Sequence, residues 1–296
     1  MSGNIRKLFI AEPHGFCNGV RNALECVENL LRDLPENGRI YVYNEIVHNS
    51  FIVNKLKSRN VQFVHSLDDV PAGSAVVWSA HGVAPALEAA ARAKGLMIKD
   101  ATCPRVQKLH LLAMQHCQNN DAVIFAGHRN HPETVGVMGC GNIYCVSSVE
   151  DCDLLPDFPP EQRVVMLTQT TWCRSEVEKL AEVLKKRFPQ LEQIADICYA
   201  TSERQQAVLD LIRLKNIDQL LVIGSPHSSN SQRLCETARR YDVPALLIDD
   251  PESIRQMNFD QTEALGITAG ASAPELLLEK ALEILTTQHN FIISGE

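Results

Sequence analysis

The 296-residue sequence contains three similar segments in succession, and each places one cysteine where a strand pattern ends and a helix pattern begins. The cysteines are Cys17 in Pro-His-Gly-Phe-Cys-Asn-Gly-Val, Cys103 in Asp-Ala-Thr-Cys-Pro and Cys198 in Asp-Ile-Cys-Tyr-Ala-Thr. Internal similarity of this kind indicates a fold built from equivalent units. Three equivalent cysteines can meet on a pseudo-threefold axis, where three thiolates would hold a metal centre and leave a fourth position open.

Amphipathic helix patterns alternate with short apolar strand patterns throughout the chain. Each segment opens and closes with a helix, predicted at 18–33 and 85–94, at 104–119 and 174–187, and at 201–215 and 274–286. The strands between them are predicted at 39–45 and 61–64, at 122–127 and 142–146, and at 219–224 and 245–248. Such alternation predicts parallel sheets. We therefore expect an α/β fold of three pseudo-symmetric repeats with small, mainly parallel sheets, at 1–103, 104–198 and 199–296.

Polar loops follow the strands in every repeat. Because ligands of open parallel sheets bind beyond the carboxyl ends of the strands, we expect these loops to face one central crevice. His48, His81 and His131 lie in such loops, and we interpret them as functional because polar loops at strand ends carry sites. Histidines in strand, helix or tail patterns are interpreted as structural: His65, His110, His116 and His289. The pattern leaves His14 and His128 open.

The crevice loops also supply hydroxyl and amide side chains next to predicted helix starts, namely Thr170, Thr171, Ser228, Ser229, Asn230 and Ser272. Helix N-termini attract anions through oriented N–H groups and the helix dipole. A phosphate or diphosphate ester fits this surface best. A helix cap is the alternative for Ser228 and Ser229, ahead of a helix near 231–241, and both roles are compatible. No phosphate-binding glycine loop or dinucleotide fingerprint is present, so nucleotide binding is not supported.

One carboxylate lies among these anion-binding candidates. Glu133 follows His131 by two residues in Gly-His-Arg-Asn-His-Pro-Glu. A first-turn glutamate commonly does no more than interact with the helix dipole. In a pocket that binds anions, a carboxylate is unfavourable unless it handles a proton. We therefore predict that Glu133 transfers a proton.

The remaining seven cysteines mostly lie in helix or strand patterns, where a free cysteine behaves as a small apolar residue. No Cys-x-x-Cys occurs, so the chain has neither a zinc-ribbon nor a ferredoxin-type cluster motif. Three distant cysteines without a fourth equivalent suggest an iron–sulfur cluster in which one iron lacks a protein ligand. Such an iron can act as a Lewis acid as well as an electron carrier.

Composition excludes several classes of protein. The formal net charge of −8 argues against a nucleic-acid partner, because such proteins usually carry a basic stripe. No segment approaches the roughly 18 apolar residues of a membrane span. Glu12 and Pro13 precede any apolar region that a signal peptide would need, so we expect a cytoplasmic protein whose cysteines stay reduced.

The motifs together resemble the 4-hydroxy-3-methylbut-2-enyl diphosphate reductase family, whose reaction ends the methylerythritol phosphate route to isoprenoids. The resemblance covers essentially the whole chain in the same order. It is carried by the three cysteine motifs and by Val-His-Asn, Ser-Ala-His-Gly, Gly-His-x-x-His-Pro-Glu, Thr-Gln-Thr-Thr, Ser-Ser-Asn-Ser and Ala-Gly-Ala-Ser-Ala-Pro. It implies a trefoil of three α/β units around a [4Fe–4S] cluster held by Cys17, Cys103 and Cys198, and an N-terminal strand that can join the third sheet.

The resemblance also implies a reaction and its residues. (E)-4-hydroxy-3-methylbut-2-enyl diphosphate would take up two electrons, lose its hydroxyl group and give isopentenyl or dimethylallyl diphosphate. The family pattern assigns proton relay to Glu133 with Thr170 and the bound diphosphate, and we place His131 with Glu133 and Thr170 among the catalytic residues. It assigns diphosphate binding to His48, His81, His131, Thr170, Ser228, Ser229, Asn230 and Ser272. The absence of a flavin or nicotinamide motif points to a ferredoxin or flavodoxin as the electron donor.

Departures from the family pattern are few: His14, Asn18, Arg105 and Trp172. Two other classes of function stay open from the residues. One is a non-redox iron–sulfur lyase or hydratase acting on a phosphorylated substrate, and the other is an iron–sulfur redox sensor without catalysis. A sensor would need the cluster but neither Glu133 nor the anion pocket.

Overall fold

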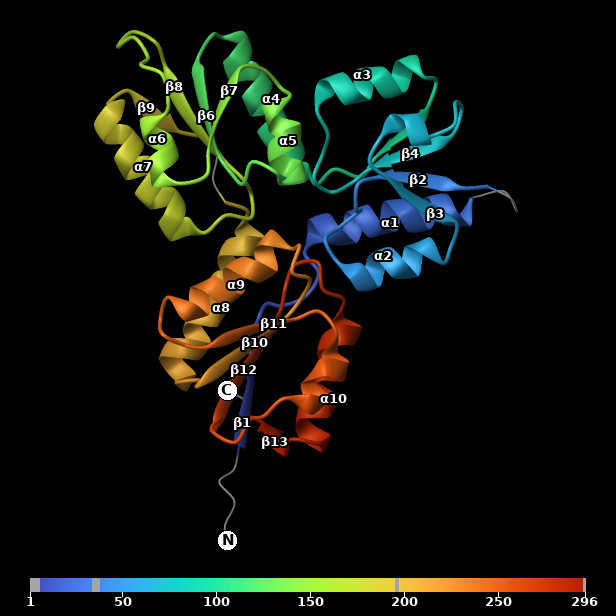
Figure 1. The fold of residues 1–296 in the computed structure, drawn as a ribbon, viewed down its shortest axis with the longest axis vertical. Coiled ribbons are helices and arrows are strands. Elements are labelled where there is room, and N and C mark those ends of the chain that lie inside the picture. The colour runs from blue at the N-terminus through green and yellow to red at the C-terminus, as the bar shows by residue number, and fades with distance from the viewer. Residues whose placement is uncertain (1–5, 34–37, 195–196, 295–296) are drawn as a thin grey trace. The chain divides into compact units, whose positions relative to one another are not determined.

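The computed structural model describes residues 6–33, 38–194 and 197–294 (Figure 1). The chain divides into two compact units. Unit 1 comprises Met1–Cys17, His48–Ile52 and Tyr199–Glu296, and unit 2 comprises Asn18–Val47 and Val53–Cys198. Asp196 of the third cysteine motif and the first five residues, on which part of the signal-peptide argument rests, lie outside the described residues.

Unit 1 is built on a five-stranded parallel sheet in the order β11-β10-β12-β1-β13. Its strands are β1 (Arg6–Ile10), β10 (Gln219–Ile223), β11 (Ala245–Ile248), β12 (Ala264–Ala269) and β13 (Phe291–Ile293). The N-terminal strand β1 therefore pairs with strands near the C-terminus. The helices of this unit are α8 (Tyr199–Lys215), α9 (Ser229–Arg239), α10 (Glu275–Thr287) and the 3-10 helix η2 (Pro251–Gln256).

Unit 2 contains two four-stranded parallel sheets, ordered β3-β2-β4-β5 and β7-β6-β8-β9. The first consists of β2 (Ile40–Tyr43), β3 (Val61–Val64), β4 (Ala75–Trp78) and β5 (Met97–Asp100). The second consists of β6 (Ala122–Ala126), β7 (Ile143–Val146), β8 (Val164–Thr168) and β9 (Leu191–Gln193). Three small parallel sheets with helices confirm the predicted fold class.

The helices associated with these two sheets are α1 (Asn18–Arg32), α2 (Ser50–Lys57), α3 (Pro85–Ala93), α4 (Pro104–Gln118), α5 (Pro132–Met138), α6 (Val149–Asp153), α7 (Arg174–Arg187) and the 3-10 helix η1 (Leu67–Asp69). Several begin with proline at the first helical position, where the missing N–H costs no hydrogen bond.

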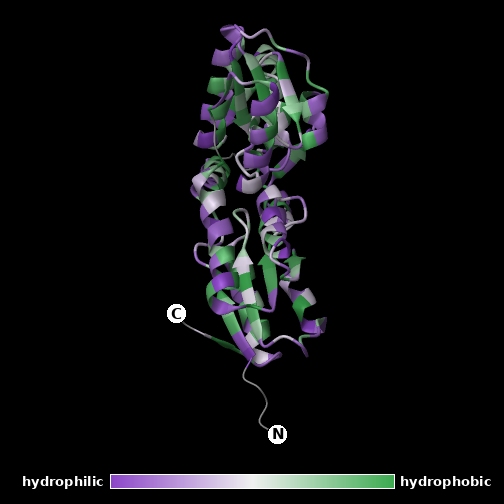
Figure 2. Ribbon diagram, turned by 90° about the vertical axis from the view of Figure 1, so that its left-hand side faces the viewer, coloured by the Kyte–Doolittle hydropathy of each residue, from purple (hydrophilic) through white to green (hydrophobic). Residues whose placement is uncertain are grey.

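Hydropathy is segregated between the strands and the outer faces of the helices (Figure 2). The inner strands β6, β8 and β10 are continuous apolar runs that are almost entirely buried, as expected for parallel strands covered on both faces. Helix α4 contacts β6 and β8, while α8 contacts β1 and β12. No helix among the described residues is both long enough and apolar enough to cross a membrane.

Each cysteine motif connects one sheet to the helix that follows it. Cys17 lies between β1 and α1, Cys103 between β5 and α4, and Cys198 between β9 and α8. Because a parallel strand leaves its sheet at the carboxyl edge, each cysteine is placed at the edge where binding sites form.

Element boundaries differ from the sequence prediction in two informative places. The strand predicted at 39–45 ends at Tyr43, because Asn44 adopts a left-handed conformation with φ of 58°. The helix predicted near 231–241 instead spans Ser229–Arg239 and begins two residues earlier, directly after its cap Ser228. Ser229 and Asn230 therefore lie in the first helical turn, and Ser228 alone acts as the cap.

Candidate active site

The three predicted cysteines have the same backbone environment. The Cys17 N–H donates to the Ala271 carbonyl over 3.1 Å, Cys103 N–H to Ala80 over 3.0 Å, and Cys198 N–H to Thr170 over 2.8 Å. Each acceptor is the second residue after a strand, because β12, β4 and β8 end at Ala269, Trp78 and Thr168. The three-repeat pattern thus extends to individual hydrogen bonds. All three side chains are half-buried and outside any disulfide bond, and each lies directly before a helix.

The other cysteines have a different character. Burial raises the pKa of Cys140 to about 12 and the pKa values of Cys152 and Cys235 to about 11. Burial also raises the pKa values of Cys26, Cys117 and Cys145. A thiol whose pKa is raised in this way is a poor nucleophile and a poor metal ligand. These six side chains behave as small apolar residues.

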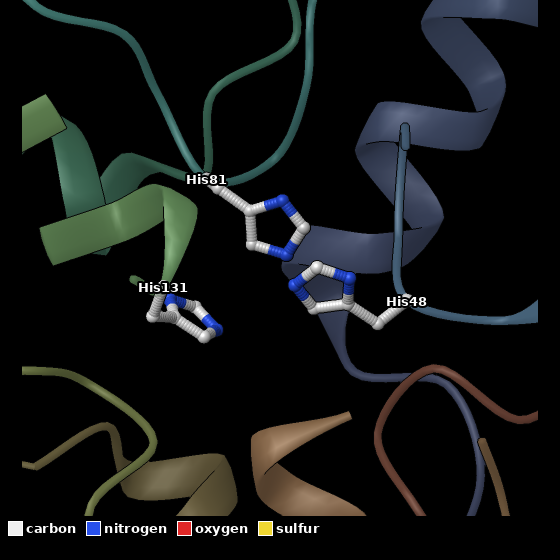
Figure 3. A group of neighbouring side chains, drawn as sticks. All are labelled: His48, His81 and His131. Atoms are coloured by element: carbon white, nitrogen blue, oxygen red, sulfur yellow. The ribbon is translucent and has the colours of Figure 1, made fainter. Parts of the chain in front are cut away.

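Unit 2 brings His81 and His131 together. His81 is the third residue after β4, and His131 is the N-cap residue of α5, where its Nδ1 accepts a hydrogen bond from the Glu133 N–H over 3.2 Å. Their ring centroids lie 5.5 Å apart with the rings perpendicular. Figure 3 shows the two rings, together with His48 from the loop between β2 and α2.

Glu133 lies in the first turn of α5 with its side chain buried and its carboxylate against Thr170. The Thr170 N–H donates to Glu133 Oε1 over 2.7 Å, and the Thr170 Oγ1 hydroxyl donates to Oε2 over 2.9 Å. Burial raises the pKa of Glu133 to about 7, although both hydrogen bonds from Thr170 favour the ionised form. A carboxyl group with such a pKa can both hold and release a proton near neutral pH.

The raised pKa of Glu133 predicts a pH dependence of stability. Between the ordinary glutamate pKa of 4.5 and about 7, the folded protein holds a proton that the unfolded chain has released. The free energy of unfolding should therefore fall as pH rises through this range, by up to about 3 kcal/mol.

Urea unfolding of the wild type and Glu133→Gln at pH 5 and pH 8 measures this effect. We expect the Gln variant to lose less stability between the two pH values than the wild type. Equal losses would show that Glu133 does not titrate in this range.

Unit 1 brings together the third group of predicted ligands. Ser228 caps α9 by accepting a hydrogen bond from the Ser231 N–H at 3.3 Å, and Ser272 is the third residue after β12. The Ser272 hydroxyl donates to the His48 carbonyl oxygen over 2.9 Å and lies 3.4 Å from Ser228 Oγ. These contacts fix the backbone of His48 beside the start of α9. Ser229, in the first turn of that helix, is also buried.

Asn230 is oriented by one specific hydrogen bond. Its Oδ1 accepts the Ala271 N–H over 2.8 Å, and its side chain is buried. The Nδ2 amide group has no protein partner. A buried donor without a partner is unfavourable, and binding of an anion would satisfy it.

The predicted ligands occupy corresponding positions in different repeats. His48, His131 and Ser228 are each the fifth residue after a strand, because β2, β6 and β10 end at Tyr43, Ala126 and Ile223. His81, Thr171 and Ser272 are each the third residue after the strands β4, β8 and β12. Equivalent backbone positions thus carry imidazole in one repeat and hydroxyl groups in another.

Two buried residues, Gln169 and Ser231, support these loops without having been predicted as site residues. Gln169 accepts the His128 N–H with its Oε1 over 3.0 Å and donates from Nε2 to Thr171 Oγ1 over 2.9 Å. Ser231 Oγ fills the space beside Gly270: a Cβ atom at position 270 would lie only 2.1 Å from it. A polar residue directly after an apolar strand pattern was the available sequence signal for Gln169.

The two histidines that the sequence left open each have contacts within their own unit. The His128 ring stacks on Trp172 with centroids 4.8 Å apart and an angle of 11°. His14 lies between Glu12 and Glu275, at 3.2 and 3.6 Å. Arg105, a further departure from the family pattern, is exposed in the first turn of α4.

Comparison with known proteins gives one family. Residues 8–286 match the family described as LytB protein. A 4-hydroxy-3-methylbut-2-enyl diphosphate reductase from Actinobacillus pleuropneumoniae serotype 5b (strain L20) is 42% identical over 287 residues, covering 95% of this chain and 90% of that protein. The reductase of the same name from Nitrosomonas europaea is 41% identical over 286 residues, covering 94% and 87%.

Two solved structures are similar to this one. The E-1-hydroxy-2-methyl-but-2-enyl-4-diphosphate reductase from Plasmodium falciparum has a TM-score of 0.91 at 32% identity, covering 98% of this chain and 91% of that chain. A second, described as (E)-4-hydroxy-3-methyl-but-2-enyl diphosphate reductase and the terminal enzyme of the non-mevalonate pathway, has a TM-score of 0.67 at 30% identity, covering 95% and 99%.

Proposed function

The chain belongs to the LytB protein family, and we infer that it is a reductase that converts (E)-4-hydroxy-3-methylbut-2-enyl diphosphate to isopentenyl and dimethylallyl diphosphate. The reaction consumes two electrons and two protons. One proton leaves with the hydroxyl group as water, and the other is added to carbon. Among the alternatives that the residues left open, the reductase is the one supported by the names of the relatives.

Cys17, Cys103 and Cys198 are the proposed ligands of the cofactor. The residues fit an iron–sulfur cluster, because thiolates are the usual protein ligands of such clusters, the three cysteines share one backbone environment and each lies directly before a helix. A [4Fe–4S] cluster held there, with one iron lacking a protein ligand, would relay the two electrons from the external donor and would offer a Lewis-acid position. The repeated hydrogen bond at the three cysteines is the observation that carries the proposal.

Glu133 supplies the proton that leaves with the hydroxyl group. Its pKa of about 7 lets it hold a proton in a buried position and release it during the reaction. Thr170 orients the carboxyl group through two hydrogen bonds, and His131 holds the first turn of α5 in place. We assign Glu133, Thr170 and His131 to the catalytic group on this basis.

The substrate's diphosphate takes its hydrogen bonds from imidazole, hydroxyl and amide groups in this proposal. The proposed diphosphate-binding residues are His48, His81, His131, Thr170, Ser228, Ser229, Asn230 and Ser272. The start of α9 adds oriented backbone N–H groups and a favourable dipole. The unpartnered Nδ2 of Asn230 supports its assignment in particular.

The electrons come from a separate protein in this proposal, a ferredoxin or flavodoxin, because the sequence has no flavin or nicotinamide motif. We also propose, from the sequence prediction alone, that the reaction takes place in the cytoplasm. The division into three α/β repeats at 1–103, 104–198 and 199–296 is part of the same proposal.

Anaerobic purification followed by iron and sulfide analysis tests the cofactor. The same preparation should convert the substrate only when a reductant is supplied. Iron-loaded protein that leaves the substrate unchanged under these conditions would contradict the proposed function.

Substrate affinity provides a separate prediction. We expect His48→Ala and Ser272→Ala to weaken binding of the diphosphate, because each removes a donor, while the absorption spectrum of the cluster stays the same. The affinity for diphosphate is measured by inhibition of turnover with inorganic diphosphate and by calorimetric titration of the protein with inorganic diphosphate. Wild-type affinity in both variants would place the anion site elsewhere.

A further inference from the structure

Cys198 is the end of a short series of hydrogen bonds within unit 2. Its N–H donates to the carbonyl of Thr170 over 2.8 Å, and the N–H of the same Thr170 donates to Glu133 Oε1 over 2.7 Å. One residue therefore connects the proposed proton donor to the backbone of a proposed cluster ligand.

Cys17 is held by the same arrangement within unit 1. Its N–H donates to the carbonyl of Ala271 over 3.1 Å, and the Ala271 N–H donates to Asn230 Oδ1 over 2.8 Å. Asn230 and Glu133 occupy equivalent positions, each the seventh residue after the end of its strand, β10 or β6. Two different side chains thus perform the same structural task.

Cys103 differs in its outer acceptor. Its N–H donates to the Ala80 carbonyl over 3.0 Å, and the Ala80 N–H donates to the backbone carbonyl of Ile46 over 3.2 Å. No side chain takes part in this series of hydrogen bonds. Ala80, Thr170 and Ala271 have equivalent positions, each the second residue after a strand. The three series therefore differ only in the group that accepts the N–H of this residue.

The side-chain acceptors are buried, so their hydrogen bonds are not readily replaced by water. Glu133 is 2% exposed and Asn230 is 3% exposed. Removing a buried acceptor leaves its donor unsatisfied, which is costlier than the loss of an exposed hydrogen bond. Without its acceptor, the loop containing Thr170 or Ala271 would have to rearrange. Because the carbonyl of Thr170 accepts the Cys198 N–H and that of Ala271 accepts the Cys17 N–H, the cysteine would shift with the loop.

We propose that Glu133 and Asn230 are positioning residues for Cys198 and Cys17, and that Cys103 is held independently of both side chains. The proposal deepens the proposed function, on which it rests for the identity of the metal group. Its consequence is that a group contacting Glu133 acts on Cys198, a group contacting Asn230 acts on Cys17, and Cys103 stays in place in both cases.

Amide hydrogen exchange of the cluster-loaded protein, read at single residues, tests the series of hydrogen bonds directly. In Glu133→Ala we expect the Thr170 and Cys198 amides to exchange about tenfold faster, as loss of one buried hydrogen-bond partner predicts, while the Cys17 amide keeps its wild-type rate. In Asn230→Ala the effect should move to Ala271 and Cys17. The Cys103 amide should be unaffected in both variants.

Conservative variants separate positioning from a general loss of stability. Glu133→Gln and Asn230→Asp keep an acceptor oxygen, so they should restore slow exchange at the affected cysteine. His48→Ala is the matched control, because it removes a proposed diphosphate ligand but no member of these series. Wild-type exchange at Cys198 in Glu133→Ala, or equal acceleration at all three cysteines, would overturn the proposal.

Iron release to a chelator provides a second measurement. Glu133→Ala and Asn230→Ala should release iron several-fold faster than the wild type, Glu133→Gln and His48→Ala. Equal release rates would overturn the link to the metal group. A different result would contradict the proposed function, namely full iron content after replacement of any of the three cysteines. Amide exchange can be measured whether or not the proposed function holds.

Discussion

Cys17→Ala, Cys103→Ala and Cys198→Ala are each expected to lose iron and to abolish reductase activity. Each thiol is the proposed protein ligand of one iron, and removal of one thiolate leaves that iron with no ligand from the protein. The three thiols also share one backbone environment, so no variant should be milder because of its position. Iron and sulfide content, the cluster absorption spectrum and reductant-driven turnover measure the effect after anaerobic purification.

Cys26→Ala is the matched control for this prediction. Cys26 lies in α1, the helix that begins directly after Cys17, and burial raises the pKa of its thiol. We expect this variant to keep its iron and its activity. Full iron content in any one of the three proposed ligand variants would contradict the assignment. Loss of iron from Cys26→Ala would show that iron loss is not specific to the three proposed ligands.

The fold was predictable because its signals are local. Apolar runs such as Gln219–Ile223 read as buried strands, and proline at the first position of α4 and α5 marks where helices begin. Helix starts were less predictable where the cap was ambiguous. Ser228 and Ser229 are equally good caps by residue type, and only the hydrogen bond from the Ser231 N–H distinguishes them.

The contacts that give Glu133 its chemistry were beyond the sequence. Its partner Thr170 lies 37 residues further along the chain, and Asn230 lies 41 residues from Ala271. Pairing at such distances depends on how the loops after β6 and β8, or β10 and β12, meet at a sheet edge. The sequence supplied the residue type and the helix start, while the burial that raises the pKa of Glu133 follows from the tertiary structure.

The predicted site residues lie at the same offsets after the ends of their strands, and the parallel sheets explain why. Parallel neighbouring strands end at one edge, so the same offset after each strand places a residue in an equivalent environment. His131 and Ser228 illustrate this, since each caps the helix that follows its strand. Substitution of a different polar residue at an equivalent position therefore changes the chemistry offered to a ligand and leaves the backbone unchanged.

Glu133→Gln is expected to lower turnover about 10²-fold or more, the effect typical of a general acid. The substitution is compatible with the site, because the amide oxygen can accept the Thr170 N–H while the amide nitrogen donates to Thr170 Oγ1. Gln therefore preserves the hydrogen bonds that position the side chain and removes only the proton that Glu133 can release.

A purely structural glutamate would give the opposite result in the same experiment. If Glu133 only interacts with the dipole of α5, its neutral replacement costs about 0.3–1 kcal/mol of stability and leaves turnover nearly normal. Measuring turnover and the melting temperature on one anaerobic, iron-loaded sample separates the two roles. Wild-type turnover by Glu133→Gln would show that the proton comes from another group, since the positions of Thr170 and Cys198 would be the same in both proteins.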